Sequence, residues 1–283
     1  MIVGRATELA AVADVISTQA SQGAALALVG PAGVGKSAIL RAGLAALQPD
    51  TTLVSIAGAE AEAELAWAGL TQIFLPLSSA VAGLTTHQQA VVRGVLGLER
   101  APSDDVVTTA MATLGLLTEA AGERGLIVAV DDFHWLDPST QQVLAFVSRR
   151  LASSNVSLVV SSRVPPSGFD PGALLPIGPL AADVASRWLV DEGFAPQIAA
   201  VVVAECEGLP LALQRAARVL TEPERVGAKA LPRPLMFGSA MEERYAAALA
   251  GLPTPTQYAL AALAVVGHDL TLHDTLALAA CDA

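Results

Sequence analysis

Residues 30–37 read GPAGVGKS, a glycine-rich octapeptide with one lysine next to its terminal serine. Gly30, Gly35, Lys36 and Ser37 stand at the fixed positions of the phosphate-binding loop pattern. Glycines let successive backbone N–H groups wrap around phosphates, the lysine reaches the terminal phosphates, and the serine hydroxyl ligates Mg²⁺. An apolar run precedes the loop and a helical pattern follows it, which is the context that this motif requires. The stretch therefore predicts a phosphate site rather than a plain glycine-rich turn.

Short apolar runs on both sides of this loop predict the strands of a parallel sheet. The run before the loop is continuous and apolar, which suits a strand buried on both faces. Strands that alternate with helices imply a parallel sheet covered on both sides, so the predicted fold class is a three-layer α/β/α sheet. The predicted strands are 24–30, 51–58, 126–130, 156–163 and 174–180.

Helical patterns fill most of the remaining chain. In residues 5–22, Leu9, Val12 and Ile16 share one face at helical spacing. Before another helix, Asp137 is a good N-cap and the proline after it suits the first helical position. After residue 180 the pattern is purely helical up to a proline-rich link. The further predicted segments are 38–47, 60–123 with a break at 99–103, 181–193, 196–207, 210–220 and the link 221–234.

Composition narrows the class of protein. Of 283 residues, 53% are hydrophobic and 15% are charged, which suits a compact, helix-rich globular chain. A formal net charge of −11 disfavours a nucleic-acid-binding surface. Two scattered cysteines are too few for a disulfide framework or a metal cluster, which favours a reducing compartment.

Membrane insertion and secretion are not expected. The N-terminus carries charges where a signal peptide needs an apolar core. Residues 65–92 lack formal charge, but Pro76, His87 and several polar residues interrupt them, so no stretch of about 20 apolar residues forms. We therefore expect a cytoplasmic protein without a membrane helix.

A second group of polar residues follows the third predicted strand, where residues 126–140 read LIVAVDDFHWLDPST. In phosphate-loop enzymes an acid at the tip of a neighbouring strand completes the Mg²⁺ shell. Asp131 is placed for that role, and Asp132 for polarising the attacking water. The alternative for both is a solvated strand end that caps the next helix. For Asp137, helix capping already explains the residue.

Other candidates lie near these motifs. Arg163 ends the fourth predicted strand, where it is placed to sense a terminal phosphate, and the alternative is a surface arginine. In EGLPLAL (207–213) one helix ends and another begins at Pro210. The motif is a candidate for a role in the site, and the alternative is that it only ends one helix and starts the next. For His134 and Trp135 two interpretations remain: a hydrophobic plug between loop and helix, or a role in the site.

The motifs VGR (3–5) with Glu8, GPAGVGKS, VDDFHWLDPST, SSR and GLPLAL occur in this order. Together they resemble the ATPase module of the large ATP-binding LuxR-type transcriptional regulators, which are STAND-class signalling ATPases. The resemblance covers about residues 2–215. Members continue with a helical-repeat sensor and a helix-turn-helix, neither of which is in this sequence, so an N-terminal part of a longer regulator is expected.

The resemblance implies a domain order and an activity. A P-loop nucleotide-binding domain is expected over 1–180, a helical subdomain over 181–230, and the start of a winged-helix-like domain over 231–283. ATP or ADP with Mg²⁺ are the implied cofactors, and slow Mg²⁺-dependent ATP hydrolysis is the implied activity. Nucleotide-dependent self-association is also expected.

The resemblance further implies roles for single residues. The backbone of Val3 and Gly4 is expected to contact adenine with Arg5 nearby, and Pro210 is expected to contact adenine as well. The implied nucleotide-binding set is Val3, Gly4, Arg5, Gly30, Pro31, Ala32, Gly33, Val34, Gly35, Lys36, Ser37, Ala38 and Pro210. The implied catalytic set is Lys36, Asp131, Asp132 and Arg163, with Ser37 and Asp131 as metal ligands.

Three functions stay in competition. The leading hypothesis is a regulatory switch in which bound nucleotide sets the domain arrangement. A small-molecule kinase with the same loop needs an acceptor site and usually an arginine-rich lid, but residues 60–123 hold only two arginines. A nucleotide-binding scaffold without hydrolysis is the third. None of these predicts specific binding of duplex DNA by the present chain.

Overall fold

The structure is a computed structural model that describes residues 2–18, 22–47, 51–99, 105–232, 235 and 249–266. The chain divides into two compact units. The first comprises Met1–Trp188 with Glu207–Leu211 and contains the sheet, and the second comprises Leu189–Cys206 with Ala212–Ala283. In its described part the second unit is helical.

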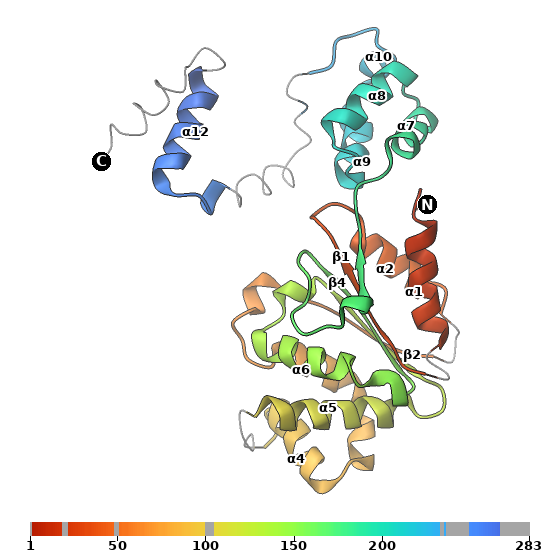
Figure 1. Ribbon diagram of the computed structural model, residues 1–283, viewed down its shortest axis with the longest axis vertical. Coiled ribbons are helices and arrows are strands. Elements are labelled where there is room, and N and C mark those ends of the chain that lie inside the picture. The colour runs from red at the N-terminus through yellow and green to blue at the C-terminus, as the bar shows by residue number, and fades with distance from the viewer. Residues whose placement is uncertain are drawn as a thin grey trace. The chain divides into compact units, whose positions relative to one another are not determined.

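The first unit is built on one sheet of five parallel strands in the order β2-β3-β4-β1-β5 (Figure 1). β4 therefore lies between β1, which leads into residues 30–37, and β3, which ends in the two acids. The register pairs Val29 with Ser162 and Val130 with Val160, so these three strands end at the same edge of the sheet. The strands are β1 Ala25–Val29, β2 Thr52–Ala57, β3 Leu126–Asp131, β4 Val156–Ser162 and β5 Leu174–Pro176.

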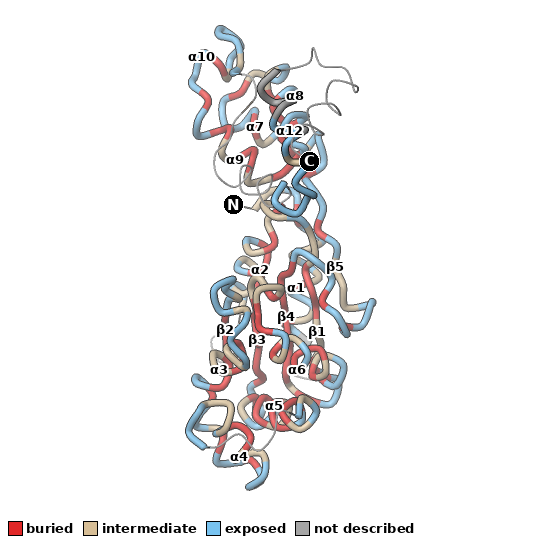
Figure 2. Tube along the Cα trace, turned by 90° about the vertical axis from the view of Figure 1, so that its left-hand side faces the viewer, coloured by how far each residue is buried: buried red, intermediate tan, exposed pale blue. Residues whose placement is uncertain are grey.

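Helices cover both faces of this sheet, as the sequence predicts. α1 (Ala6–Thr18) and α2 (Lys36–Leu44) lie on one face, and α5 (Val106–Ala121) and α6 (Pro138–Ser148) lie on the other (Figure 1). Figure 2 shows the central strands buried between them. β4 is buried at every residue, which is why its sequence is a continuous apolar run instead of an alternating one. The predicted parallel three-layer fold is confirmed.

Alternate residues of β4 face different layers. The Ser157 hydroxyl donates to the Val15 carbonyl of α1 at 2.8 Å, whereas Val160 packs in the core cluster that contains Leu144 of α6. Because strand side chains alternate, Ser161 faces the same layer as Ser157. The strand thus directs the Ser161 hydroxyl toward α2, which follows the phosphate loop.

The segment between β2 and β3 is helical in its described part. Its elements are η1 Glu60–Glu62, α3 Ala68–Phe74, η2 Leu75–Gly83, α4 Thr86–Val95 and α5. Thr85 and Gln88 form a capping box at the start of α4, and Asp105 caps α5 with its side chain. The predicted break at 99–103 falls between α4 and α5. Residues 100–104 lie outside the described part of the chain.

Short elements complete the first unit. η3 (Phe133–Trp135) follows β3, η4 (Leu151–Ser153) precedes β4, and η5 (Pro171–Ala173) precedes β5. β5 is shorter than the predicted 174–180 because its partner β1 ends at Val29, opposite Pro176. The next residue, Ile177, still donates to the Val29 carbonyl at 2.6 Å.

Further helices in the described part of the chain are α7 Ala182–Asp191, α8 Pro196–Glu205, α9 Pro210–Val219, α10 Glu222–Arg225 and α12 Thr254–Val266. The link predicted over 221–234 contains α10 because Thr221 and Glu224 form a capping box. The winged-helix-like start predicted for 231–283 falls largely outside the described residues, of which α12 is one part. No helix in the described ranges is long and apolar enough to cross a membrane.

Candidate functional site

The phosphate loop (residues 30–37) needs its glycines for conformation and for space. Gly33 and Gly35 have φ angles of +77° and +102°, a region that side chains rarely enter. A Cβ on Gly30 would lie 2.2 Å from the carbonyl oxygen of Ile177. Successive peptides in such conformations form the concave, N–H-lined surfaces that hold anions. The helix α2 begins at Lys36, so its N-terminus points at the loop.

Lys36 is 6% exposed, and its Nζ donates to two carbonyls at the start of the loop, at 2.9 and 3.0 Å. Burial lowers the pKa of this ammonium group below its usual value. The charge of Asp132 raises that pKa, the charge of Arg163 lowers it, and the charge of Asp131 raises it. The lysine and these three groups therefore form one electrostatic cluster.

Ser37 and Asp131 meet although they are 94 positions apart in sequence. The Ser37 hydroxyl donates to Oδ1 of Asp131 at 2.8 Å. Ser161 donates to the same oxygen at 2.5 Å, and the Asp132 N–H approaches it at 3.2 Å. Ser161 is a site residue that the sequence reasoning missed. The feature of the sequence that could have identified Ser161 is its hydroxyl group at the end of a buried, otherwise apolar strand.

Asp132 has a left-handed backbone, with φ 50° and ψ 48°. Its N–H donates to the Ser161 hydroxyl at 3.0 Å, which anchors the turn between β3 and η3. Gly58 lies against this turn, since a Cβ there would be 2.4 Å from the Asp132 carbonyl oxygen. A non-glycine residue in this region is uncommon and often marks a functional site. The turn fixes where the Asp132 carboxylate leaves the strand tip.

His134 and Trp135 both contact Arg163. The Arg163 N–H donates a long hydrogen bond of 3.4 Å to Nδ1 of His134, and the guanidinium lies 5.8 Å from the Trp135 ring centroid. Within the described residues, Nε2 of His134 is buried without a hydrogen-bond partner. Burial lowers the pKa of this imidazole, and the charge of Asp132 opposes that shift. The two residues that the sequence left open therefore adjoin the predicted phosphate sensor.

Asp137 is 1% exposed and caps two helices. Its Oδ1 accepts from the N–H of Thr140 in α6 and from that of Trp67, both at 3.0 Å. Its Oδ2 accepts from the N–H of Gly69 in α3 at 3.1 Å. The predicted N-cap of α6 is confirmed. The cap of α3 was not foreseen, because its donors lie about 70 residues earlier in the chain.

Of the residues predicted to contact adenine, Gly4 packs against α7 and Pro210 lies next to the phosphate loop. Gly4 has a φ of +67°, and a Cβ there would come within 2.6 Å of Val184. Pro210 begins α9, with its ring 4.0 Å from the position of a Cβ on Gly35. The next residue, Leu211, donates its N–H to the Gly33 carbonyl at 3.1 Å. The segment 207–211 thus packs on the phosphate loop.

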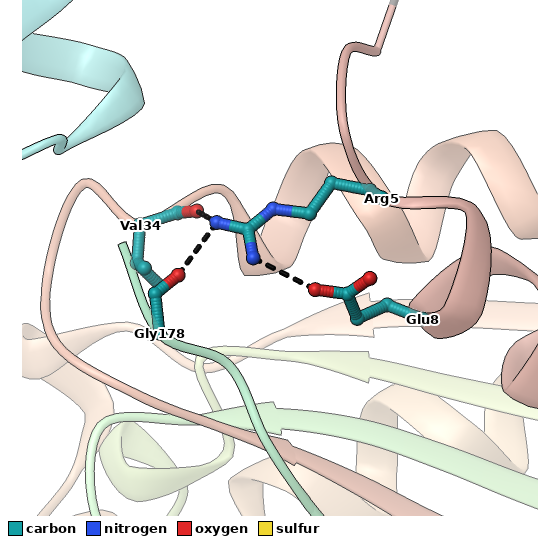
Figure 3. Close-up of polar contacts among 4 residues, drawn as sticks. All are labelled: Arg5, Glu8, Val34 and Gly178. Atoms are coloured by element: carbon teal, nitrogen blue, oxygen red, sulfur yellow. Dashed lines mark hydrogen bonds and ion pairs between the residues drawn. The ribbon is translucent and has the colours of Figure 1, made fainter. Parts of the chain in front are cut away.

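Arg5 is 6% exposed, and its side chain reaches the phosphate loop (Figure 3). Its Nη2 donates to the Val34 carbonyl at 3.1 Å and to the Gly178 carbonyl at 2.6 Å. Its Nη1 pairs with Glu8 at 2.7 Å. Figure 3 shows the guanidinium between these three partners. None of these contacts was predicted from the sequence motifs.

Exposure varies among the other predicted residues. Val34 is fully buried, Val3 and Ala32 are half-buried, and Pro31 and Ala38 are exposed. Arg163 is exposed at the tip of β4. At the edge of the sheet, hydrogen bonds join Ser37, Asp131, Asp132 and Ser161, and the charges of Asp131 and Asp132 act on Lys36.

The sequence model of one protein family, described as an AAA ATPase domain, matches residues 2–160. No curated protein matches the sequence significantly. Solved structures do resemble the chain. A signal transduction ATPase with numerous domains (STAND) from Pyrococcus horikoshii, with a tetratricopeptide repeat sensor, has a TM-score of 0.52 at 16% identity. The match covers 93% of this chain and 34% of that one, so this chain spans about a third of its length.

Two further similarities are weaker. Drosophila ORC bound to DNA has a TM-score of 0.48 at 15% identity, covering 95% of this chain and 75% of that one. A Walker-type ATPase of Pyrococcus abyssi has a TM-score of 0.47 at 16% identity, covering 98% of this chain and 88% of that one. At these identities the similarity of the STAND protein concerns the fold alone.

Proposed function

Because the chain belongs to the AAA ATPase domain family, we propose that it binds ATP with Mg²⁺ at the phosphate loop and hydrolyses it slowly as a signalling switch. One observation carries the proposal. The Ser37 hydroxyl of the loop and the Asp131 carboxylate of β3 lie 2.8 Å apart, next to a buried lysine. Phosphoryl transfer needs a metal ligand pair and a cation in such an arrangement.

The residues present fit ATP and Mg²⁺. Hydroxyl and carboxylate oxygens are the hard ligands that Mg²⁺ prefers, and it usually takes one or two protein groups together with phosphate oxygens. Gly33 and Gly35 supply the backbone curvature of an anion site. When bound, Mg²⁺ would neutralise charge on the phosphates. Ser37 and Asp131 would hold it.

Each of the remaining groups has a proposed task. Lys36, which now donates to two loop carbonyls, would donate to the terminal phosphates instead. Asp132 would accept a hydrogen bond from the attacking water and orient it. Arg163, placed over the Trp135 ring at the neighbouring strand tip, would contact the γ-phosphate. Val3, Gly4 and Pro210 would border the adenine.

We further propose that the switch serves a LuxR-type transcriptional regulator. The support is the ordered set of sequence motifs, above all VDDFHWLDPST at 130–140. In this proposal the bound nucleotide determines the arrangement of α9 and the helices after it, because the first residues of α9 contact the phosphate loop. A cytoplasmic location and nucleotide-dependent self-association belong to the same proposal. Light scattering with ADP and with a non-hydrolysable ATP analogue tests the self-association.

Turnover with ATP and Mg²⁺ alone separates this proposal from a kinase and from a scaffold. A switch should release phosphate slowly without any added acceptor. A kinase should need an acceptor, and a scaffold should bind ATP without turnover. The control is the Lys36→Ala variant, measured in parallel to exclude a contaminating ATPase. Absence of both binding and turnover in the wild-type protein would refute the proposal.

A further inference from the structure

Two carbonyl groups of the phosphate loop, those of Gly33 and Val34, accept hydrogen bonds from donors outside the loop. Arg5 donates to the Val34 carbonyl at 3.1 Å, and Leu211 donates to the Gly33 carbonyl at 3.1 Å. Both donors come from segments far from the loop in sequence. Neither contact involves a side chain of the loop, so each acts on the loop backbone itself.

The orientation of a carbonyl fixes that of the next N–H. In a planar trans peptide the C=O of one residue and the N–H of the following residue point in opposite directions. The Val34 carbonyl points to Arg5, so the Gly35 N–H of the same peptide points away from Arg5. Gly35 has a φ of +102° and no Cβ to restrain it, so this peptide depends on an external contact for its orientation.

Arg5 is itself fixed on three sides. Its guanidinium also donates to the Gly178 carbonyl at 2.6 Å and pairs with Glu8 at 2.7 Å (Figure 3). The planar fork of an arginine can serve several acceptors at once, whereas a lysine is a compact point charge. At 6% exposure, the guanidinium depends on these acceptors in place of water.

We propose that Arg5 is a positioning residue for phosphate binding. It orients the Val34–Gly35 peptide, so that the loop already has its phosphate-binding conformation before the ligand arrives. This inference rests on the proposed nucleotide site. It differs from a direct contact with adenine, because a residue that shapes the loop must affect any ligand that carries the phosphates, with or without a base.

The test compares ADP with inorganic tripolyphosphate. The Mg²⁺ complexes of both are titrated into the wild-type protein and the Arg5→Lys variant, by displacement of a fluorescent ADP analogue so that weak binding is also measured. We expect Arg5→Lys to weaken both ligands by the same factor, roughly tenfold, as for the loss of a charge-assisted hydrogen bond. Arg187→Lys is the matched control, since Arg187 is 73% exposed and pairs with Asp183. It should change neither affinity.

Two outcomes for Arg5→Lys would contradict the inference. A loss confined to ADP would mean that Arg5 contacts the base, and unchanged affinity for both ligands would mean that it serves the fold alone. Thermal unfolding checks that the variants are folded. If Arg5→Lys does not fold, Glu8→Gln replaces it, because this change loosens the guanidinium and leaves its backbone acceptors in place. A smaller, equal weakening of both ligands supports the inference. If the wild-type protein binds neither ligand, the proposed function itself has failed.

Discussion

Ser37 and Asp131 share a 2.8 Å hydrogen bond across the tips of two strand-loop junctions, with β4 lying between their strands. The carboxylate of the adjacent Asp132 leaves the same tip in a left-handed turn. Two neighbouring acids with different backbone conformations are suited to different tasks. We therefore predict that the acid that accepts from the loop serine, Asp131, holds the metal.

Asp131→Asn should weaken the Mg²⁺ dependence of ATP binding, because an amide is a poorer ligand than a carboxylate. Asp132→Asn should leave Mg²⁺-dependent binding intact and slow turnover by about a hundredfold or more, as for loss of a general base. Binding is measured with and without Mg²⁺, and turnover by phosphate release. Asp183→Asn on the surface is the control. Equal losses of metal dependence and turnover in both variants would show that this division of roles is wrong.

Lys36→Ala should lower ADP affinity by about two orders of magnitude, since a partly desolvated cation facing phosphates is lost. The chain offers a matched control because Lys229 is its only other lysine. Lys229 pairs with Glu224 at 2.7 Å, and Lys229→Ala should leave ADP affinity unchanged. Calorimetry on both folded variants makes the comparison. If the Lys36→Ala variant bound ADP as tightly as the wild-type protein, residues 30–37 would not be a phosphate-binding loop.

Asp137→Asn should lower the free energy of unfolding by about 2–4 kcal/mol, because an amide cannot accept from all three N–H groups that the buried carboxylate serves. The control is Asp170→Asn, an exposed cap that accepts from the N–H of Gly172 alone among the described contacts. It should cost about 1 kcal/mol or less. Urea unfolding measures both. Similar losses in the two variants would contradict the double-cap interpretation.

Glu224 should make the second unit sensitive to acid. Hydrogen bonds from Lys229 and Thr221 lower the pKa of this carboxyl from 4.5 to about 2. A lowered folded-state pKa stabilises the fold above the unfolded value, and this stabilisation is lost as pH falls from 4.5 toward about 2. The difference in unfolding free energy between wild type and Glu224→Gln should therefore shrink over that range. A difference that does not vary with pH would refute this assignment.

The present chain should not bind duplex DNA selectively. Phosphate neutralisation needs clustered cations, and 16 lysines and arginines stand against 27 acids. Residues 252–283 contain neither lysine nor arginine. Anisotropy titrations with promoter and random duplexes, at low and physiological salt, provide the measurement. Selective binding that survives physiological salt would place a DNA-recognition site within the present chain.

The central strands β3 and β4 were predictable because burial on both faces leaves a continuous apolar run. β3 and β4 lie within one residue of their predicted ends for that reason. The phosphate loop and the two acids could be expected to lie close together, because parallel strands end at the same edge of a sheet. The roles of Lys36, Ser37, Asp131 and Asp132 stay predictions.

Contacts of the backbone over long distances were not predictable. Arg5 and Gly178 are 173 positions apart, and neither residue type reveals a carbonyl acceptor. The second cap made by Asp137 was hidden for the same reason. A local motif indicates which groups a residue offers to its own helix, but gives no sign of N–H groups brought in by tertiary packing.

The sheet order has a consequence for synthesis of the chain. β1 is the first strand made, yet its neighbours on the two sides are β4 and β5, the last two. β1 cannot pair with these neighbours before they are made, so we expect both of its edges to stay unpaired while the intervening residues are added. Exposed strand edges promote association with other chains during that interval. The contacts that close the sheet around the phosphate loop at the end of β1 therefore become possible only once residues 156–178 have been made.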